Sequence, residues 1–284
     1  MIRMCTNNTT TTVDIVQGVM YIPVFLFGFF IHVAALRAFI VKRNSWTDTH
    51  IYMLNLAIAD TTLVLFLPVR IYDAFICLPI TYFCTVLISI HYINMYASIL
   101  TTAAISVHRY LAVRFPMQTR SWRKKKAIAV GVCFIIWGLL IGTCAAFSGE
   151  NSPEKLWTCY ERRKNKPLNK TFMIFMVVVG FLIPLIIVLF CSSQILSDLS
   201  KVDNTSANKK AVTGIVRANM IVFIVCYTPI HIGFLVNYFI KPPPNWQNTV
   251  MPAHIYLIVS EWIASTNCCF DSISYYFLLK SSFS

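Results

Sequence analysis

Long apolar runs are the feature of this chain that most limits its fold. A helix needs about 20 mostly apolar residues to cross the hydrocarbon core of a bilayer. Runs of that length occur seven times, near residues 14–41, 49–76, 81–114, 125–147, 168–199, 208–240 and 248–279. The 284 residues are 57% hydrophobic and 12% charged, with a mean hydropathy of +0.66, so the chain is more apolar than a soluble domain. We therefore predict an all-α fold, a bundle of seven transmembrane helices.

Charge in the loops between these runs predicts how the chain is oriented. Lysine and arginine gather after the first, third and fifth runs and beside the last one, and loops of this kind face the cytoplasm. The N-terminus then lies outside and the C-terminus inside, as in a multi-pass protein of the plasma membrane. The first run has no small-residue cleavage site, so we expect it to remain as a helix. Three parts follow, an outer tail, a membrane domain and a short inner end, at residues 1–13, 14–280 and 281–284.

The predicted outer side carries two further signals. N-x-[ST] patterns, which mark N-glycosylation, occur at Asn7, Asn8 and Asn169. The outer loop, residues 154–170, holds six lysines or arginines against two glutamates. This charge either raises the local concentration of an anionic ligand or only keeps the loop solvated. The net charge of +13 otherwise lies mainly in the cytoplasmic loops, where it suits lipid headgroups and a partner protein and does not argue for nucleic acid.

Cysteines divide between the runs and the outer side. Of the ten, six fall inside apolar runs, where a free thiol behaves as a small apolar residue. The remaining four lie near the oxidising face, at Cys5, Cys77, Cys84 and Cys159. A disulfide between Cys84 and Cys159 would pin the outer loop over the bundle. Elimination leaves Cys5 with Cys77 as a possible second pair.

Two polar residues interrupt the last apolar run. Asn267 and Asp271 lie one helical turn apart in the segment "NCCFDSISYYF". A carboxylate in hydrocarbon is costly, so such a residue faces a polar interior and marks a functional path. The chain shows no metal triad, no nucleophile with a base and no glycine-rich phosphate loop, so we expect no enzyme.

Six short motifs together resemble one receptor family. They are "NLAIAD" (55–60), "SVHRYLAVRFP" (106–116), Trp137, Pro184, "FIVCYTP" (223–229) and "NCCFDSISYY" (267–276). In this order they resemble the rhodopsin-like G-protein-coupled receptors, over residues 14 to 280. The segment "SWTDTHIYMLNLAIAD" and Ser272 in the usual proline position are similar to the purinergic and lysophospholipid-type branch, near its kynurenate-responsive and lysophosphatidylinositol-responsive receptors.

The resemblance implies a polar cluster in the middle of the membrane. Its members would be Asp60, Asn94, Ser98, Asn267 and Asp271. Two carboxylates among oxygen ligands suit a small hard cation, and the family precedent is an allosteric sodium ion. A hydrogen-bonded water network with one acid protonated is the alternative, because it also satisfies the buried groups. We expect no other cofactor.

The resemblance also implies an outer ligand pocket. The corresponding positions are Arg70, Asp73, His91, Tyr92, Met95, His231, Phe234 and Glu261. Arg70 is the expected anchor, because a guanidinium pairs bidentately with a carboxylate or phosphate. Glu261 either pairs with Arg70 until an acidic ligand displaces it or forms a permanent bridge between helices. Met95 stands where the kynurenate-responsive relative has a basic residue, so a lysophospholipid fits at least as well as a small organic acid.

At the inner face the resemblance implies G-protein coupling. The coupling residues would be His108, Arg109 and Tyr110, and the activation switch Phe223, Tyr227, Pro229 and Tyr275. The partner would be a heterotrimeric G protein of the 12/13 or i/o type. His108 replaces the usual acid beside Arg109, so we expect a weakly restrained resting state and basal signalling, which a ligand-free comparison with His108→Asp would test.

Other functional classes have less support. A decoy receptor that binds ligand without coupling remains the alternative, because the altered "HRY" triplet could abolish coupling. A transporter would usually show interrupted paired segments or internal symmetry, and neither is apparent. A retinal-type light sensor requires a lysine in the last helix, which has none before Lys280.

Overall fold

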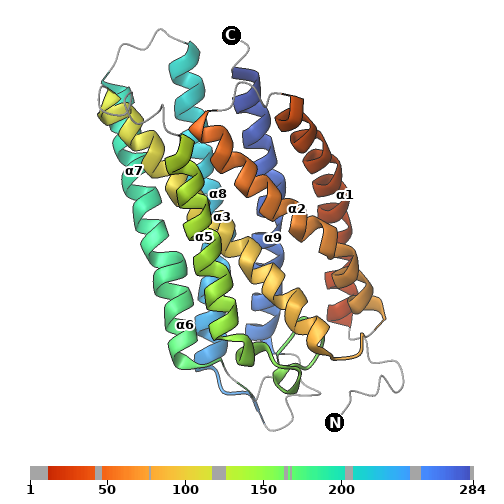
Figure 1. The fold of residues 1–284 in the computed structure, drawn as a ribbon. Helices are drawn as coiled ribbons and strands as arrows, with labels where there is room; N and C mark the ends of the chain where they lie inside the picture. The colour runs from red at the N-terminus through yellow and green to blue at the C-terminus, as the bar shows by residue number, and fades with distance from the viewer. Residues whose placement is uncertain are drawn as a thin grey trace.

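The computed structural model is a bundle of long helices that run roughly alongside one another (Figure 1). It describes residues 12–41, 47–76, 78–116, 126–162, 166, 168–201, 207–243 and 251–281. The long helices are α1 (Thr12–Val41), α2 (Asp48–Phe75), α3 (Tyr82–Arg114), α5 (Lys126–Ala146), α6 (Lys170–Val177), α7 (Ile183–Ser200), α8 (Ala207–Phe239) and α9 (Pro252–Ser281). The π-helical turn η4 (Val178–Leu182) joins α6 to α7, so these three form one membrane-crossing unit.

The prediction of a seven-helix membrane bundle is therefore confirmed. Within the described ranges, six helical units are long and apolar enough to cross a membrane, and α9 completes the bundle beside α1, α2 and α8. Helix bounds lie within two residues of the apolar runs, except that α9 begins at Pro252 and not near residue 248. Proline suits the first turn of a helix because its missing N–H has no partner there anyway.

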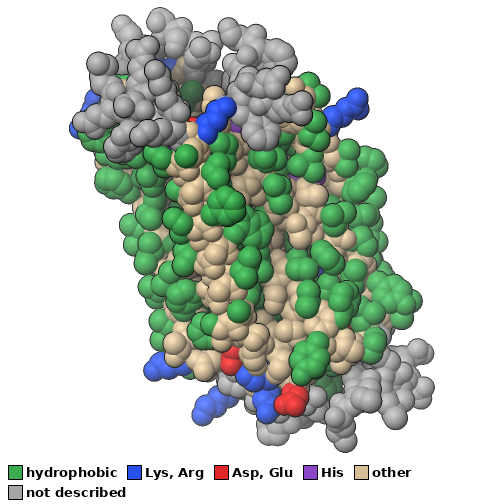
Figure 2. All heavy atoms as spheres, viewed as in Figure 1, with side chains coloured by type: hydrophobic (Ala, Val, Ile, Leu, Met, Phe, Trp, Pro, Cys, Tyr) green, Lys and Arg blue, Asp and Glu red, His purple; other side chains and the backbone are tan. Residues whose placement is uncertain are grey.

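Apolar side chains cover the outside of the bundle. Figure 2 shows them along the length of the helices, with lysine and arginine at the two ends. Phe27, Phe30 and Phe134 are among the exposed members. This surface suits hydrocarbon, and the polar groups inside must find partners within the bundle.

Polar side chains join helices inside the bundle. Trp137 Nε1 on α5 donates to Asn55 Oδ1 on α2 at 2.7 Å. The amide of Asn55 then donates to the hydroxyl of Thr101 on α3 at 3.0 Å. These two hydrogen bonds fix three helices relative to one another and satisfy buried polar groups that lipid cannot.

A disulfide holds the outer loop on the bundle. Cys84 near the start of α3 is bonded to Cys159, which confirms that predicted pair. The short helices η2 (Ser148–Asn151) and η3 (Pro153–Lys155) lead into the loop. Cys5, Cys77, Asn7 and Asn8 lie outside the described residues.

The π-helical turn brings Gly180 against Tyr96 of α3. A Cβ at Gly180 would lie 2.5 Å from Tyr96 Cε1, which is closer than carbon atoms approach without displacement. At Gly142 on α5, by contrast, a Cβ would meet no atom within 4 Å. A glycine is therefore needed at the first position and not at the second.

We predict that Gly180→Ala destabilises the helical bundle by about 1–3 kcal/mol, the usual cost of overpacking a core. Gly142→Ala makes the same chemical change in open space and gains helix propensity, so its stability should match or slightly exceed wild type. The apparent melting temperature of each purified variant in detergent gives the comparison. Equal melting temperatures for Gly180→Ala and wild type would contradict the close approach.

Candidate functional site

An outer cavity of about 120 Å³ lies between the outer loop and helices α3, α8 and α9. Its walls include Tyr92, Phe234 and Glu261, three of the residues predicted to bind ligand. The loop contributes Tyr160, Glu161, Arg162, Lys166 and Leu168. The cavity therefore has aromatic walls and side chains of both charges at its rim.

Arg70 lies behind this cavity and is paired with Glu261. Arg70 Nη2 is 2.6 Å from Glu261 Oε2, and the two side chains are only 6% and 16% exposed. The guanidinium also lies over the rings of Tyr21 and Tyr160, with centroids at 4.6 and 5.0 Å. Aromatic faces attract a cation, so the charge is enclosed on several sides.

Two buried nitrogens around this ion pair lack hydrogen-bond partners. They are Arg70 Nε and His91 Nε2, judged against the residues that the structure describes. Arg70 and His91 are 5% and 9% exposed, so water reaches them poorly. Unpaired buried donors and acceptors are costly, and a ligand group that reached them would remove that cost.

The remaining residues predicted to bind ligand lie away from the outer cavity. Asp73 accepts the backbone N–H of Leu78 at 2.9 Å, so it closes the turn after α2. Met95 is buried in the central apolar cluster. His231 is 2% exposed and hydrogen-bonded inside the bundle. These three side chains make contacts within the protein and do not line the outer cavity.

Glu150 offsets much of the positive charge on the outer loop. Its carboxylate is 2.9 Å from Lys155 Nζ and 3.4 Å from Arg162 Nη2, and it accepts the backbone N–H of Asn169 at 3.0 Å. Burial raises the pKa of Glu150, but these hydrogen bonds and charges outweigh it, so the pKa lies below its usual value. Lys155 and Arg162 are thus held by Glu150, and both Arg162 and Lys166 line the cavity.

The outer loop is attached to α9 and α6 as well as to α3. His254 Nε2 near the start of α9 is 3.4 Å from Glu161 Oε2. Asn169, the glycosylation candidate, is exposed, and its side chain accepts the backbone N–H groups of Thr171 and Phe172 at the start of α6. The described part of the loop is therefore held beside the cavity by contacts with α3 and α9.

The polar cluster in the middle of the membrane forms two hydrogen-bonded groups. Asp60 Oδ1 accepts from Asn94 and from Ser98, each at 3.3 Å. Asn267 Nδ2 donates to Asp271 Oδ2 at 2.6 Å. Over the described ranges, no set of three or more His, Cys, Asp or Glu side chains is close enough to hold a metal ion. A cation here would therefore depend on amide and hydroxyl oxygens as well as the carboxylates.

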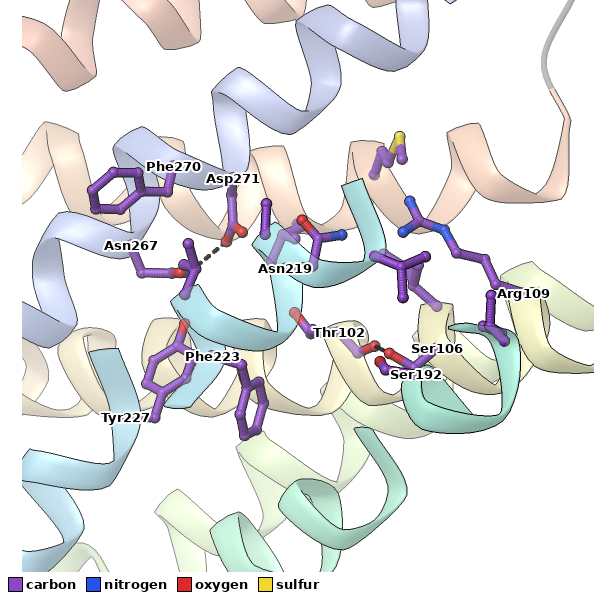
Figure 3. Close-up of a pocket in the computed structure, with 17 residues that line it drawn as sticks. Thr102, Ser106, Arg109, Ser192, Asn219, Phe223, Tyr227, Asn267, Phe270 and Asp271 are labelled. Carbon is purple, nitrogen blue, oxygen red and sulfur yellow. Dashed lines mark hydrogen bonds between the residues drawn. The ribbon is translucent and has the colours of Figure 1, made fainter. Parts of the chain in front are cut away.

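An inner cavity of about 130 Å³ leads from this cluster toward the cytoplasm. Figure 3 shows Asn267 and Asp271 at one end, Arg109 at the other and Asn219 between them. Arg109 forms no ion pair with any residue in the described part of the chain. The missing acid partner predicted from the sequence is thus not replaced by another described residue.

The neighbours of Arg109 contact other helices. His108 Nε2 is 3.6 Å from Asp48 Oδ2 at the start of α2. Tyr110 packs edge-on against Phe190 of α7, with ring centroids 5.8 Å apart. His108 is therefore a partner for α2, a contact that the sequence did not indicate.

The predicted switch residues lie together in the core. Phe223 and Tyr227 are buried one turn apart on α8, with ring centroids at 5.3 Å. Pro229 follows inside the same helix. A proline there removes one backbone hydrogen bond and makes this level of α8 a natural hinge. The side chain of Tyr275 lies outside the described residues.

Comparisons with known proteins agree with this architecture. The family model "7 transmembrane receptor (rhodopsin family)" matches residues 31–275. The chain belongs to the rhodopsin family of seven-transmembrane receptors. It is therefore a receptor of the plasma membrane that senses a ligand and acts through G proteins, and members of this family are not enzymes.

Several curated members of the rhodopsin family are similar over most of the chain. Human G-protein coupled receptor 55 is 30% identical over 273 residues, covering 93% of this chain and 85% of that protein. Human G-protein coupled receptor 35 is 32% identical over 260 residues, covering 89% and 80%. Lysophosphatidic acid receptor 6 of Gallus gallus is 32% identical over 292 residues, covering 92% and 89%.

Sequence reasoning missed three residues that shape the outer site. Tyr21 on α1 and Tyr160 in the outer loop enclose Arg70, and Glu150 organises the loop. Tyr160 directly follows the disulfide-bonded Cys159, which is a signal that could have placed it over the bundle. Nothing in the sequence near Tyr21 indicates its contact with Arg70.

Two ion pairs in this receptor differ enough in burial to give a matched test. We predict that Glu261→Ala lowers the free energy of unfolding by about 3–5 kcal/mol, because it leaves the buried Arg70 charge unpaired. Asp198→Ala breaks the pairs of Asp198 with Arg114 and Lys201, which are 53% and 70% exposed, and should cost less than about 1 kcal/mol. Denaturation in detergent measures both. Similar losses for the two variants would contradict a buried pair at Arg70.

Proposed function

We propose that this receptor senses an extracellular anionic ligand, and that Arg70 is its anchor. The ion pair between Arg70 and Glu261 carries the proposal, because Glu261 lines the outer cavity while Arg70 lies directly behind it. A guanidinium offers a planar fork of donors that fits a carboxylate or a phosphate. In the structure Arg70 Nη2, one of these donors, is bonded to the carboxylate of Glu261.

Ligand binding then exchanges one anion for another. The ligand's acid group takes the place of Glu261 on Arg70, and its further oxygens reach Arg70 Nε, which has no partner among the described residues. The displaced Glu261 faces the outer cavity, whose rim also carries Lys166, Arg162 and His254. The ligand adds one negative charge to the site, and Lys166 at the rim is the cation that can face the displaced Glu261.

A lysophospholipid headgroup or a small organic acid supplies the required charge. The name of lysophosphatidic acid receptor 6 supports the first class, since that relative covers most of this chain. The aromatic walls formed by Tyr92, Phe234 and Tyr160 suit apolar parts of either ligand. Met95 is buried in the core, so this position offers no basic side chain to a kynurenate-like acid.

At the inner face, we infer coupling to G proteins of the 12/13 or i/o type. Arg109 lines the inner cavity and Tyr110 lies beside it on α3, where a helix of the G protein would dock. We also infer that Asp60, Asn94 and Ser98 bind a sodium ion together with Asn267 and Asp271, which the two hydrogen-bonded groups of oxygens support. A water network joining the same groups remains the competing proposal.

G-protein dissociation in cells tests the proposal directly. We predict that one class of probe, lysophosphatidic acid, lysophosphatidylinositol or kynurenate, activates wild type and that Arg70→Ala loses the response by at least about tenfold in potency, since hydrogen bonds to charged groups contribute about 1.5–3 kcal/mol. Arg37→Ala changes an exposed arginine on α1 and serves as the matched control. An unchanged response in Arg70→Ala would exclude the anchor. Probe binding without G-protein dissociation would instead support the decoy alternative.

A further inference from the structure

A hydrogen bond between Tyr96 and His231 joins α3 to α8 near the hinge. The Tyr96 hydroxyl is 3.2 Å from His231 Nε2. Both residues are buried, at 7% and 2% exposure, so water competes little for these groups. The position lies two residues beyond Pro229, where the backbone hydrogen bonds of α8 are already interrupted.

The proton positions along this contact follow from the acceptors. His231 Nδ1 is 2.7 Å from the backbone oxygen of Tyr227. A carbonyl oxygen can only accept, so Nδ1 carries a proton, and Nε2 of the neutral ring is then an acceptor. Tyr96 must therefore donate its O–H to His231. One imidazole thus connects α3 to the backbone of α8 on the far side of Pro229.

Neighbouring rings hold the imidazole in place. Phe181 of the π-helical turn stacks on His231, with centroids 4.1 Å apart and planes at 10°. The same turn places Gly180 against the ring of Tyr96, where a Cβ would lie 2.5 Å from a ring carbon. π-Helical turns often occur at functional sites. Here the turn allows side chains of three helical units to meet at one histidine.

The contact is also connected to the outer cavity. Phe234 lines that cavity and packs edge-on against His231, with centroids 5.7 Å apart. Phe234 further contacts Tyr92, another cavity residue, at 6.1 Å. A ligand that moves Phe234 therefore pushes on the ring that bridges Tyr96 and Tyr227.

We propose that the Tyr96–His231 hydrogen bond restrains α8 in the resting receptor, and that His231 is the positioning residue through which the outer cavity releases it. Movement of the inner half of α8 about Pro229 changes the angle between the two halves of α8, and the bond from Tyr96 to His231 just beyond this hinge opposes that change. The proposed restraint lies in the middle of the bundle, between the outer cavity and the inner cavity that Arg109 lines.

Tyr96→Phe removes only the hydroxyl and tests the proposal without ligand. The expected result is a rise of about two- to tenfold in the ratio of active to resting receptor, which corresponds to one net hydrogen bond. G-protein dissociation at matched surface expression reports this ratio. Tyr72→Phe makes the same change at an exposed position on α2 and should leave basal activity unchanged. Basal activity of Tyr96→Phe equal to wild type would overturn the proposal.

Two replacements of His231 separate the restraint from ordinary packing. In His231→Asn the amide nitrogen takes the place of Nδ1, so the bond to Tyr227 is kept and the bond to Tyr96 is lost. In His231→Gln the amide oxygen takes the place of Nε2 and accepts from Tyr96. Both variants lose the stacked ring, so a purely structural role predicts equal effects. The proposal predicts high basal activity for His231→Asn and near-normal activity for His231→Gln.

A conformational measurement keeps the test independent of coupling. A fluorine label attached through Val212→Cys, an exposed position in the first turns of α8, reports the position of its inner end by NMR. Tyr96→Phe and His231→Asn should shift the resonance in the same direction, and the double variant should add little to either single change. Additive shifts, or no shift, would contradict a shared hydrogen bond. The response to acids in Arg70→Ala tests the proposed ligand anchor separately, because the Tyr96–His231 restraint is measured without ligand.

Discussion

The ion pair between Arg70 and Glu261 is the interaction on which the outer half of this receptor depends. A charge inside a membrane bundle must be paired, because neither lipid nor an apolar core solvates it. The pair joins α2 to α9, and the rings of Tyr21 and Tyr160 add α1 and the outer loop around it. The disulfide from Cys84 to Cys159 then fixes that loop to α3. Several helical elements therefore converge on one guanidinium beside the cavity.

Further polar contacts lie between the Arg70–Glu261 pair and the inner face of the bundle. Tyr96 and His231 connect α3 to α8, and Asp60 collects Asn94 and Ser98 just beyond them. Asn267 and Asp271 line the inner cavity that ends at Arg109. These contacts satisfy groups that hydrocarbon cannot, and the bonds of Asp60 and of His231 also join different helices. The hydrogen bonds between helices thus stabilise the bundle.

Much of the fold could be predicted from sequence because a membrane imposes simple rules. Apolar runs predicted the helices to within a few residues. The bond between Cys84 and Cys159 was predicted from their places at the start of the third run and in the outer loop. The site was harder to predict, because it depends on which side chains meet across helices. The pairing of Arg70 with Glu261 was foreseen, because both alternatives, a displaceable pair and a permanent bridge, contain it. The enclosure by Tyr21 and the partners of His231 depend on helix rotation and on a π-helical turn, which no local pattern marks.

The central claim is that a ligand anion replaces Glu261 on Arg70, and the potency of acids on Glu261→Gln tests it most directly. Gln removes the competing charge but keeps the size of the side chain, so the most active acid of the probe set should act at a lower concentration than on wild type. Glu161→Gln removes an acid that lines the same cavity but pairs with His254, and it should shift potency less. Unchanged or weaker potency in Glu261→Gln, at matched surface expression, would contradict the exchange.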